Sequence, residues 1–159
     1  MGAFADVEAE EPQFAARVRA CFDAHAHKFL ATLRPDGSPR ISGIEMKFVA
    51  GEPWLAGMPG SVKFTDLRRD ARFALHSGSS EPDAFDADAK LSGRATAVID
   101  DEERRQYAVA AGVPPEHMGF ELFRVELGQV VLVALNDEKT ALLISSWRPG
   151  RGLATTARD

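Results

Sequence analysis

The chain is organised around residues 54–69, which read Trp54-Leu-Ala-Gly-Met-Pro-Gly-Ser-Val-Lys-Phe-Thr-Asp-Leu-Arg-Arg69. A short apolar run ends at Gly57-Met-Pro-Gly60, and a helical pattern begins after it. Ser61 is placed to cap that helix, because a serine hydroxyl can accept a hydrogen bond from a free amide of the first turn. Lys63 falls in the same turn, where the helix dipole disfavours a cation. An anion shared by Lys63 and the free amides would resolve this conflict. The alternative is a surface helix whose lysine points to water.

Composition restricts the classes of function. The chain has 159 residues, 45% of them hydrophobic and 27% charged, which suits one globular domain. A formal net charge of −5 argues against a nucleic acid partner, because a duplex requires a basic face. The sequence contains no signal peptide pattern and no apolar stretch long enough to span a bilayer, so no membrane partner is expected. With a single cysteine, an intrachain disulfide is excluded, and we expect a cytoplasmic protein.

Two further groups of side chains were considered as chemical sites. Cys21 and His25 are four residues apart on a predicted helix, a spacing that would let the histidine activate the thiol. The alternative is a small residue on a packing helix, since free cysteines are usually buried and inert. The pair His25 and His27 has no further ligands at zinc-site spacing, so the sequence predicts no metal site. Nucleotide-binding glycine motifs are absent as well.

The sequence predicts three regions. Residues 1–26 are an N-terminal segment, polar and expected to be frayed up to about Pro12, followed by a packing helix. That helix is indicated by apolar residues at spacings of three and four. Residues 27–152 form a β domain, and residues 153–159 a polar tail. The apolar helix positions are Phe14, Ala15, Val18, Cys21 and Phe22.

The β domain is predicted from short runs separated by turn residues. Pro35-Asp-Gly37 joins two strands, 28–34 and 38–49, into a hairpin. The second of these strands has mixed polar and apolar faces, which is typical of a strand that lines a ligand cleft or a subunit contact. Further strands are expected at 54–58, 71–77, 89–99, 120–135 with a bend near Gly128, and 140–147, with a helix over 100–112. Six or seven strands without βαβ alternation predict a mainly β protein, a closed or partly closed antiparallel β-barrel with peripheral helices.

The sequence resembles the pyridoxamine 5′-phosphate oxidase-like superfamily, the split β-barrel flavin and deazaflavin proteins, over about residues 27–152. Four segments carry the resemblance, and the most specific feature is the order Lys-x-x-x-Leu-x-x-Asp-x-Arg before an apolar strand. The segments are Leu30-Ala-Thr-Leu-Arg-Pro-Asp-Gly-Ser-Pro-Arg-Ile-Ser42, Trp54-Leu-Ala-Gly-Met58, Ser61-Val-Lys-Phe-Thr-Asp-Leu-Arg-Arg-Asp-Ala-Arg-Phe-Ala-Leu75 and Leu91-Ser-Gly-Arg-Ala95.

This resemblance implies a split antiparallel β-barrel of FMN-binding type that forms a homodimer with two cofactor clefts at the interface. FMN is the expected cofactor, and the deazaflavin F420 is the alternative. The resemblance places residues 40–46 along the isoalloxazine ring, residues 56–58 near the ring and ribityl chain, and Ser61 and Lys63 on the phosphate. The implied cofactor-binding residues are Arg40, Ser42, Gly43, Ile44, Gly57, Met58, Ser61, Lys63 and Trp147.

Two departures from the family pattern bear on the substrate. Val62 stands where the pyridoxamine phosphate oxidases proper carry an arginine before the lysine. The C-terminal segment Ser145-Ser-Trp-Arg-Pro-Gly-Arg-Gly152 only loosely matches their substrate-binding Arg-x-Glu-x-Trp segment. A vitamin B6 substrate is therefore not expected, and another small molecule is.

The leading hypothesis is a flavin- or deazaflavin-dependent oxidoreductase, in which the cofactor carries the hydride chemistry and the protein orients it. Arg40 is a second candidate cation. Trp147 either stacks on the ring from the partner chain or closes the barrel core. No side chain stands out as an acid or base, so no catalytic residue is assigned. The alternatives are a non-catalytic dimer that binds a flavin, a haem or another planar ligand, and a member of the family without a cofactor.

Overall fold

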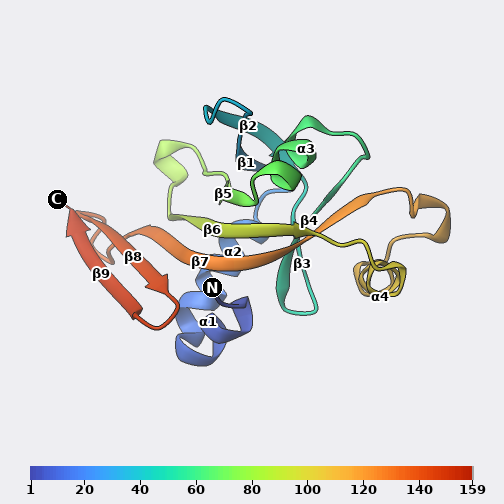
Figure 1. Cartoon of the computed structure of the whole chain (residues 1–159). Coiled ribbons are helices and arrows are strands. Elements are labelled where there is room, and N and C mark those ends of the chain that lie inside the picture. The colour runs from blue at the N-terminus through green and yellow to red at the C-terminus, as the bar shows by residue number, and fades with distance from the viewer. Residues whose placement is uncertain (159) are drawn as a thin grey trace.

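A nine-stranded antiparallel sheet is the central element of residues 1–158, the part of the chain that the computed structural model describes (Figure 1). Four α-helices accompany the sheet in this part of the chain: α1 (Phe4–Glu10), α2 (Pro12–Asp23), α3 (Val62–Arg69) and α4 (Asp101–Ala111). Two 3-10 turns, η1 (Pro82–Ala84) and η2 (Pro115–His117), lie in loops. The strands are β1 (Lys28–Leu33), β2 (Pro39–Ile44), β3 (Lys47–Val49), β4 (Glu52–Gly57), β5 (Arg72–His76), β6 (Ala87–Ala97), β7 (Glu121–Leu135), β8 (Leu142–Arg148) and β9 (Gly152–Arg158).

The strand order explains how the sheet curls into a barrel. Seven strands are hydrogen-bonded in the order β2-β1-β5-β6-β7-β4-β3. The two ends of this order, β2 and β3, are separated in the chain only by Glu45 and Met46. The chain therefore brings the two edges of the sheet together, and β2 also approaches β4. The predicted second strand, 38–49, is in fact these two strands with a break at Glu45 and Met46.

Strand β7 divides the sheet into a barrel and an extension. Its first residues, Glu121 to Arg124, pair with β4, whereas Val130 to Leu135 pair with β8. Between these two parts, the pairing of β7 with β6 shifts register and skips Gly128, which confirms the predicted bend at this position. On the opposite strand, a Cβ atom on Gly93 would lie 1.9 Å from the carbonyl oxygen of Glu126. Only glycine therefore permits the two backbones to approach so closely at the bulge.

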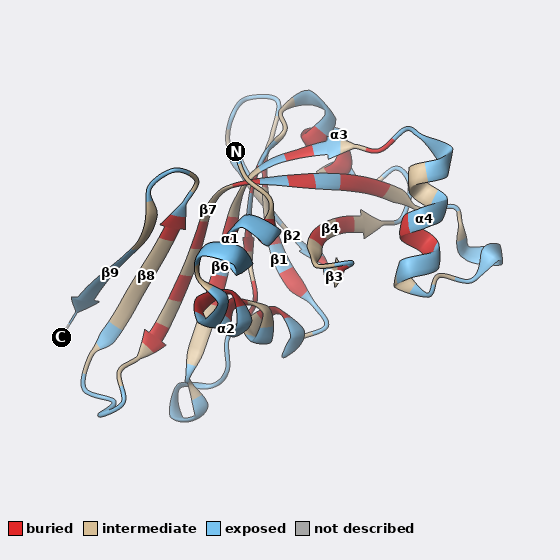
Figure 2. Ribbon diagram, turned by 90° about the horizontal axis from the view of Figure 1, so that it is seen from below, coloured by how far each residue is buried: buried red, intermediate tan, exposed pale blue. Residues whose placement is uncertain are grey.

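The N-terminal residues are ordered, so the expectation of a frayed N-terminus is wrong. Phe4 and Val7 of α1 are fully buried, because their apolar surface outweighs the polar residues around them. Helix α1 packs beside α2 (Figure 2). The carboxylate of Glu52 accepts hydrogen bonds from the amides of Phe4 (2.8 Å) and Ala5 (3.0 Å). Gly2 exchanges two backbone hydrogen bonds with Leu127 in the middle of β7.

Helices α2 and α4 follow their sequence signals. Phe14, Val18 and Phe22 of α2 are buried, as the spacing predicted. Helix α4 begins where Asp100 accepts a hydrogen bond from the amide of Glu103 (2.8 Å). It ends at Gly112, which has a φ of +68°.

The C-terminal region corrects two predictions. Residues 153–158 of the predicted polar tail belong to strand β9, which pairs with β8 along its whole length. The last residue of the predicted tail, Asp159, lies outside the described residues. Trp147 is fully buried in the core of its own chain, and its Nε1 donates a hydrogen bond to Glu10 (2.7 Å). The sequence left two roles open for Trp147, stacking on a ligand or closing the barrel core. The structure shows the second role, because the buried side chain has no exposed surface that could stack on a ligand. Among residues 1–158, no helix has the length and apolar character needed to cross a membrane.

Candidate functional site

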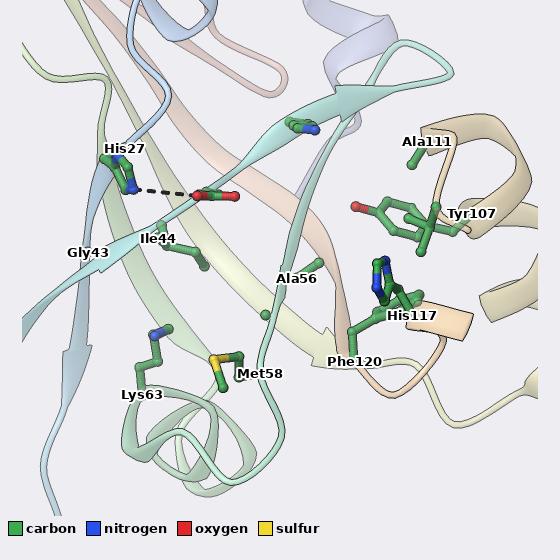
Figure 3. Close-up of a pocket in the computed structure, with 14 residues that line it drawn as sticks. His27, Gly43, Ile44, Ala56, Met58, Lys63, Tyr107, Ala111, His117 and Phe120 are labelled. Atoms are coloured by element: carbon green, nitrogen blue, oxygen red, sulfur yellow. Dashed lines mark ion pairs between the residues drawn. The ribbon is translucent and has the colours of Figure 1, made fainter. Parts of the chain in front are cut away.

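A cleft of about 600 Å³ opens where β2, β4, the start of α3 and the α4–η2 segment meet (Figure 3). This volume is in the range of small-molecule and cofactor sites. Residues that are far apart in sequence come together here because the curl of the sheet brings β2 close to β4. The lining residues are His27, Gly43, Ile44, Glu45, Lys47, Ala56, Gly57, Met58, Lys63, Tyr107, Ala111, Val113, His117 and Phe120.

One end of the cleft is formed by the start of α3. Ser61 is the N-cap residue, as predicted, but its hydroxyl does not accept a hydrogen bond from the helix. It donates to the carbonyl of Met58 instead (2.8 Å) and holds the preceding turn together. The first amides that donate within the helix are those of Phe64 and Thr65. The amides of Val62 and Lys63 have no partner within residues 1–158, as is usual at a helix N-terminus.

Lys63 is the cation of this end. Its side chain lines the cleft, and its Nζ lies 5.5 Å from the centre of the Phe64 ring (Figure 3). Within residues 1–158 it forms no ion pair with a carboxylate. The helix start is held in place by Phe64, which is fully buried and stacks on Phe123 with ring centres 4.9 Å apart. Gly57 packs beside it, since a Cβ atom there would lie 3.2 Å from the Phe64 ring.

Strand β2 and the break after it form the second side. Gly43 is exposed, whereas the side chain of Ile44 is buried in the barrel. His27 pairs with Glu45 across a distance of 3.4 Å, and both side chains are largely exposed. Lys47 also lines the cleft and has no acidic partner within the described chain. This side therefore offers one cation, Lys47, in addition to Lys63, and one carboxylate, Glu45, close to His27.

The third side is an aromatic wall that sequence reasoning did not find. The ring of Tyr107 lies between Trp54 and Phe120, at centre-to-centre distances of 5.4 and 5.7 Å. Tyr107 is only 8% exposed, yet its hydroxyl points into the cleft and has no hydrogen-bond partner within residues 1–158 (Figure 3). Burial raises the pKa of Tyr107, so the phenol remains protonated and can donate a hydrogen bond at neutral pH. His117 of η2 lies beside this wall.

The sequence contained one signal for the wall, a single tyrosine in an otherwise charged amphipathic helix. Nothing local places that helix next to Trp54 of β4, far earlier in the chain, because the contact depends on the pairing of β4 with β7.

The structure brings together five of the nine predicted cofactor-binding residues and leaves four outside the cleft lining. Gly43, Ile44, Gly57, Met58 and Lys63 line the cleft. Ser61 caps the adjoining helix, and Ser42 is half-buried opposite Leu30 in the β1–β2 ladder. Arg40 also lies outside the cleft lining, and its Nε binds the carboxylate of Asp66 at 2.7 Å. Trp147 lies in the core, as described above.

The thiol of Cys21 shows no sign of activation. The side chain is half-buried on the inner side of α2, and burial raises its pKa. A thiol in this state is a packing residue, which was the favoured alternative. No cluster of three or more potential metal ligands occurs among residues 1–158.

Comparison with known families identifies the fold. The family described as pyridoxamine 5′-phosphate oxidase matches residues 14–134 of this chain. The chain belongs to the pyridoxamine 5′-phosphate oxidase-like superfamily. This superfamily includes FMN-binding proteins, and its members share the split β-barrel that the sequence predicted. No curated protein matches the sequence.

Solved structures agree with this assignment at the level of the fold. A pyridoxamine 5′-phosphate oxidase-related, FMN-binding protein from Nostoc punctiforme superposes with a TM-score of 0.58 at 14% identity, over 91% of this chain and 94% of the other. A heme-binding protein from Mycobacterium smegmatis gives 0.57 at 18% identity, over 89% and 85%. PhzG from Burkholderia lata 383, in complex with tetrahydrophenazine-1-carboxylic acid, gives 0.57 at 18% identity, over 98% and 87%.

Proposed function

We propose that this protein is an FMN-dependent oxidoreductase that acts on a small molecule. The observation that carries the proposal is Lys63, a cation without an acidic partner in the described chain, at the start of a helix that opens into a cleft of cofactor size. Helix starts of this kind bind phosphate groups, because free amides and the helix dipole both favour an anion. A protein of this superfamily with such a cleft is well suited to FMN.

The residues of the cleft fit the parts of FMN. Lys63 and the free amides of the first α3 turn would neutralise the phosphate. Backbone groups at Gly43 and Ile44, together with the close-packed Gly57, would hold the ring where no side chain obstructs it. When bound, FMN supplies the hydride chemistry, and the protein contributes binding, orientation and exclusion of water.

We further propose that the protein is a homodimer. Phe29 and Ile41 are 53% and 74% exposed on the outer face of β1 and β2. They surround a shallow hollow with Ala31 and Ala74. Gly43, which lines the cleft, lies on the same outer face two residues after Ile41. Exposed apolar patches often mark subunit contacts. A second copy on this face would cover the patch and border the cleft.

The aromatic wall is the substrate side of this proposal. Ala111, Val113 and Phe120 offer apolar surface, and the Tyr107 hydroxyl offers one hydrogen-bond donor within it. Such a wall suits a planar, mainly apolar molecule with a hydrogen-bond acceptor.

An absorbance spectrum of the purified protein tests the cofactor assignment. Flavin bands would support FMN, whereas the band of F420 after reconstitution would support the deazaflavin, whose phosphate could occupy the same helix start. Lys63→Gln should weaken FMN binding about 10- to 100-fold, because a charge-assisted hydrogen bond to the phosphate is lost. Lys139→Gln, in the turn between β7 and β8, removes the same charge far from the cleft and should leave binding unchanged. Full affinity in Lys63→Gln would refute the phosphate assignment.

A second candidate is a non-catalytic haem-binding protein. Two histidines, His27 and His117, line the cleft and could ligate iron. One structural neighbour is a heme-binding protein. Titration with haemin distinguishes the candidates: a Soret band that is lost in both His27→Ala and His117→Ala, together with no flavin binding, would favour haem.

A further inference from the structure

A buried carboxylate joins helix α3 to the first two strands of the barrel. Asp66 is 1% exposed, and its Oδ2 accepts hydrogen bonds from Thr32 Oγ1 (2.9 Å) and Arg40 Nε (2.7 Å). Its Oδ1 accepts from Arg69 one helical turn later (3.1 Å). Arg69 also donates to the carbonyl of Leu33 at the end of β1. Both oxygens of Asp66 therefore accept hydrogen bonds, two at Oδ2 and one at Oδ1.

The charge of this group is stabilised by its partners. Burial alone would raise the pKa of Asp66, but the hydrogen bonds from Arg40, Thr32 and Arg69 outweigh it and lower the pKa below its ordinary value. The carboxylate is therefore ionised at neutral pH. Removing one partner of such a buried pair leaves an unpaired buried charge, which lowers the stability of the fold.

Two of the elements that Asp66 joins, α3 and β2, meet at the proposed phosphate site. Lys63 lies three residues before Asp66 on α3, and Gly43 lies three residues after Arg40 on β2. The other buried residues of α3, Phe64 and Leu67, make apolar contacts. These contacts hold the helix against the barrel, and the hydrogen bonds of Asp66 add a constraint of defined direction between α3 and β2.

We propose that Asp66 is a positioning residue, which holds the start of α3 in register with β2 so that Lys63 and the first-turn amides face the phosphate of the cofactor. This inference rests on the proposed function. It gives Arg40 a different role from the one expected from the sequence: Arg40 acts through Asp66 and does not touch the ligand. A displacement of about 1 Å at such a site is enough to lose most of a directional contact.

The test compares FMN with riboflavin, which has the same ring and no phosphate. In the wild type, the ratio of the two dissociation constants measures the contribution of the phosphate. Asp66→Asn should reduce FMN affinity about tenfold, the effect of one weakened charge-assisted contact, and change riboflavin affinity less than twofold. Asp70→Asn is the matched control, because Asp70 caps the C-terminal end of the same helix and pairs with exposed Arg72 instead. In Asp70→Asn, the ratio of the FMN and riboflavin dissociation constants should equal that of the wild type.

A purely structural role would give a different result. It would lower the melting temperature of Asp66→Asn and weaken FMN and riboflavin equally, or weaken neither, and both outcomes overturn the inference. Thr32→Val removes one donor with little change of shape, and it should give a twofold to fourfold loss that is specific for FMN. If Asp66→Asn does not fold, an unchanged ratio in Thr32→Val overturns the inference. A wild-type protein that does not prefer FMN to riboflavin would refute the proposed phosphate site itself.

Discussion

The two ends of the cleft differ in how they are built. The cationic end, at the start of α3, rests on fully buried residues, Phe64 and Asp66, that belong to the barrel core. The aromatic wall rests on a smaller cluster around Tyr107, outside the main core, in which Trp54 and Phe120 remain half-buried. The first end is rigidly tied to two strands, whereas the second depends on one peripheral helix. Under the proposed function, we expect the end that would hold the cofactor phosphate to tolerate fewer substitutions than the wall, which would contact the substrate.

Replacing one aromatic side chain at each end of the cleft with alanine should give the largest difference, a difference in the loss of folding stability. Phe64→Ala removes a fully buried ring that stacks on Phe123, and it should lower the free energy of unfolding by about 3–5 kcal/mol. Phe120→Ala removes a half-buried ring and should cost about 1–2 kcal/mol, since less surface is transferred to water. Urea denaturation of both variants measures this. Equal losses would contradict the distinction between a core-built and a peripheral end.

The next largest effect should be the salt dependence of flavin binding at the cationic end. If Lys63 binds a phosphate, FMN affinity should fall by several-fold between about 0.05 and 0.5 M salt, because exposed charges are screened. Riboflavin affinity should stay constant over the same range, since its contacts are uncharged. Fluorescence titration with each flavin provides the values. A salt-independent FMN affinity would show that no charge on the protein contributes to phosphate binding.

The wall should respond to loss of one oxygen atom. Tyr107→Phe removes the hydroxyl that points into the cleft, and it should weaken binding of 1-indanone, a planar aryl ketone, about threefold to tenfold. Indane, which lacks the carbonyl, should bind both proteins equally. NMR titration of the FMN-loaded protein measures both ligands. FMN affinity should not change in this variant, and a parallel loss of FMN binding would contradict the separation of the two ends.

The smallest effect should be an opposite response of the two ends to pH. Asp66 and Asp70 have lowered pKa values, that of Asp70 being about 2, so they stabilise the fold above the unfolded-state pKa near 4. This stabilisation is lost as the pH falls through the folded-state pKa. Tyr107 has a raised pKa, so its contribution is lost as the pH rises above the unfolded-state value near 10.

Denaturation midpoints measured at acid and alkaline pH check both signs. Asp66→Asn and Asp70→Asn should reduce the loss of stability in acid, and Tyr107→Phe should reduce the loss in base. The reverse pattern would show that other groups dominate the pH dependence of stability.

Much of the fold follows from local signals, and the errors have physical reasons. Asp100 and Gly112 mark the ends of α4 because caps depend only on neighbouring atoms. The sequence does not reveal that Phe4 and Val7 are buried, because the seven residues of α1 are too few to show an apolar face without the sheet that covers it. Residues 153–158 form β9 only because β8 offers an open edge, and a polar edge strand has no apolar pattern to reveal it.

The sequence by itself determined the family, through the motifs that resemble it, and the antiparallel sheet with a helix after the fourth strand. Strand alternation, turn residues and helix ends are encoded within a few neighbouring positions, so these features follow from local sequence. Tertiary structure alone decided which side chains share the cleft. It paired Arg40 with Asp66, buried Trp147 in the core and set Tyr107 opposite Lys63. These outcomes depend on contacts between residues tens of positions apart, and the geometry of the closed barrel, which no local pattern contains, determines which of them meet.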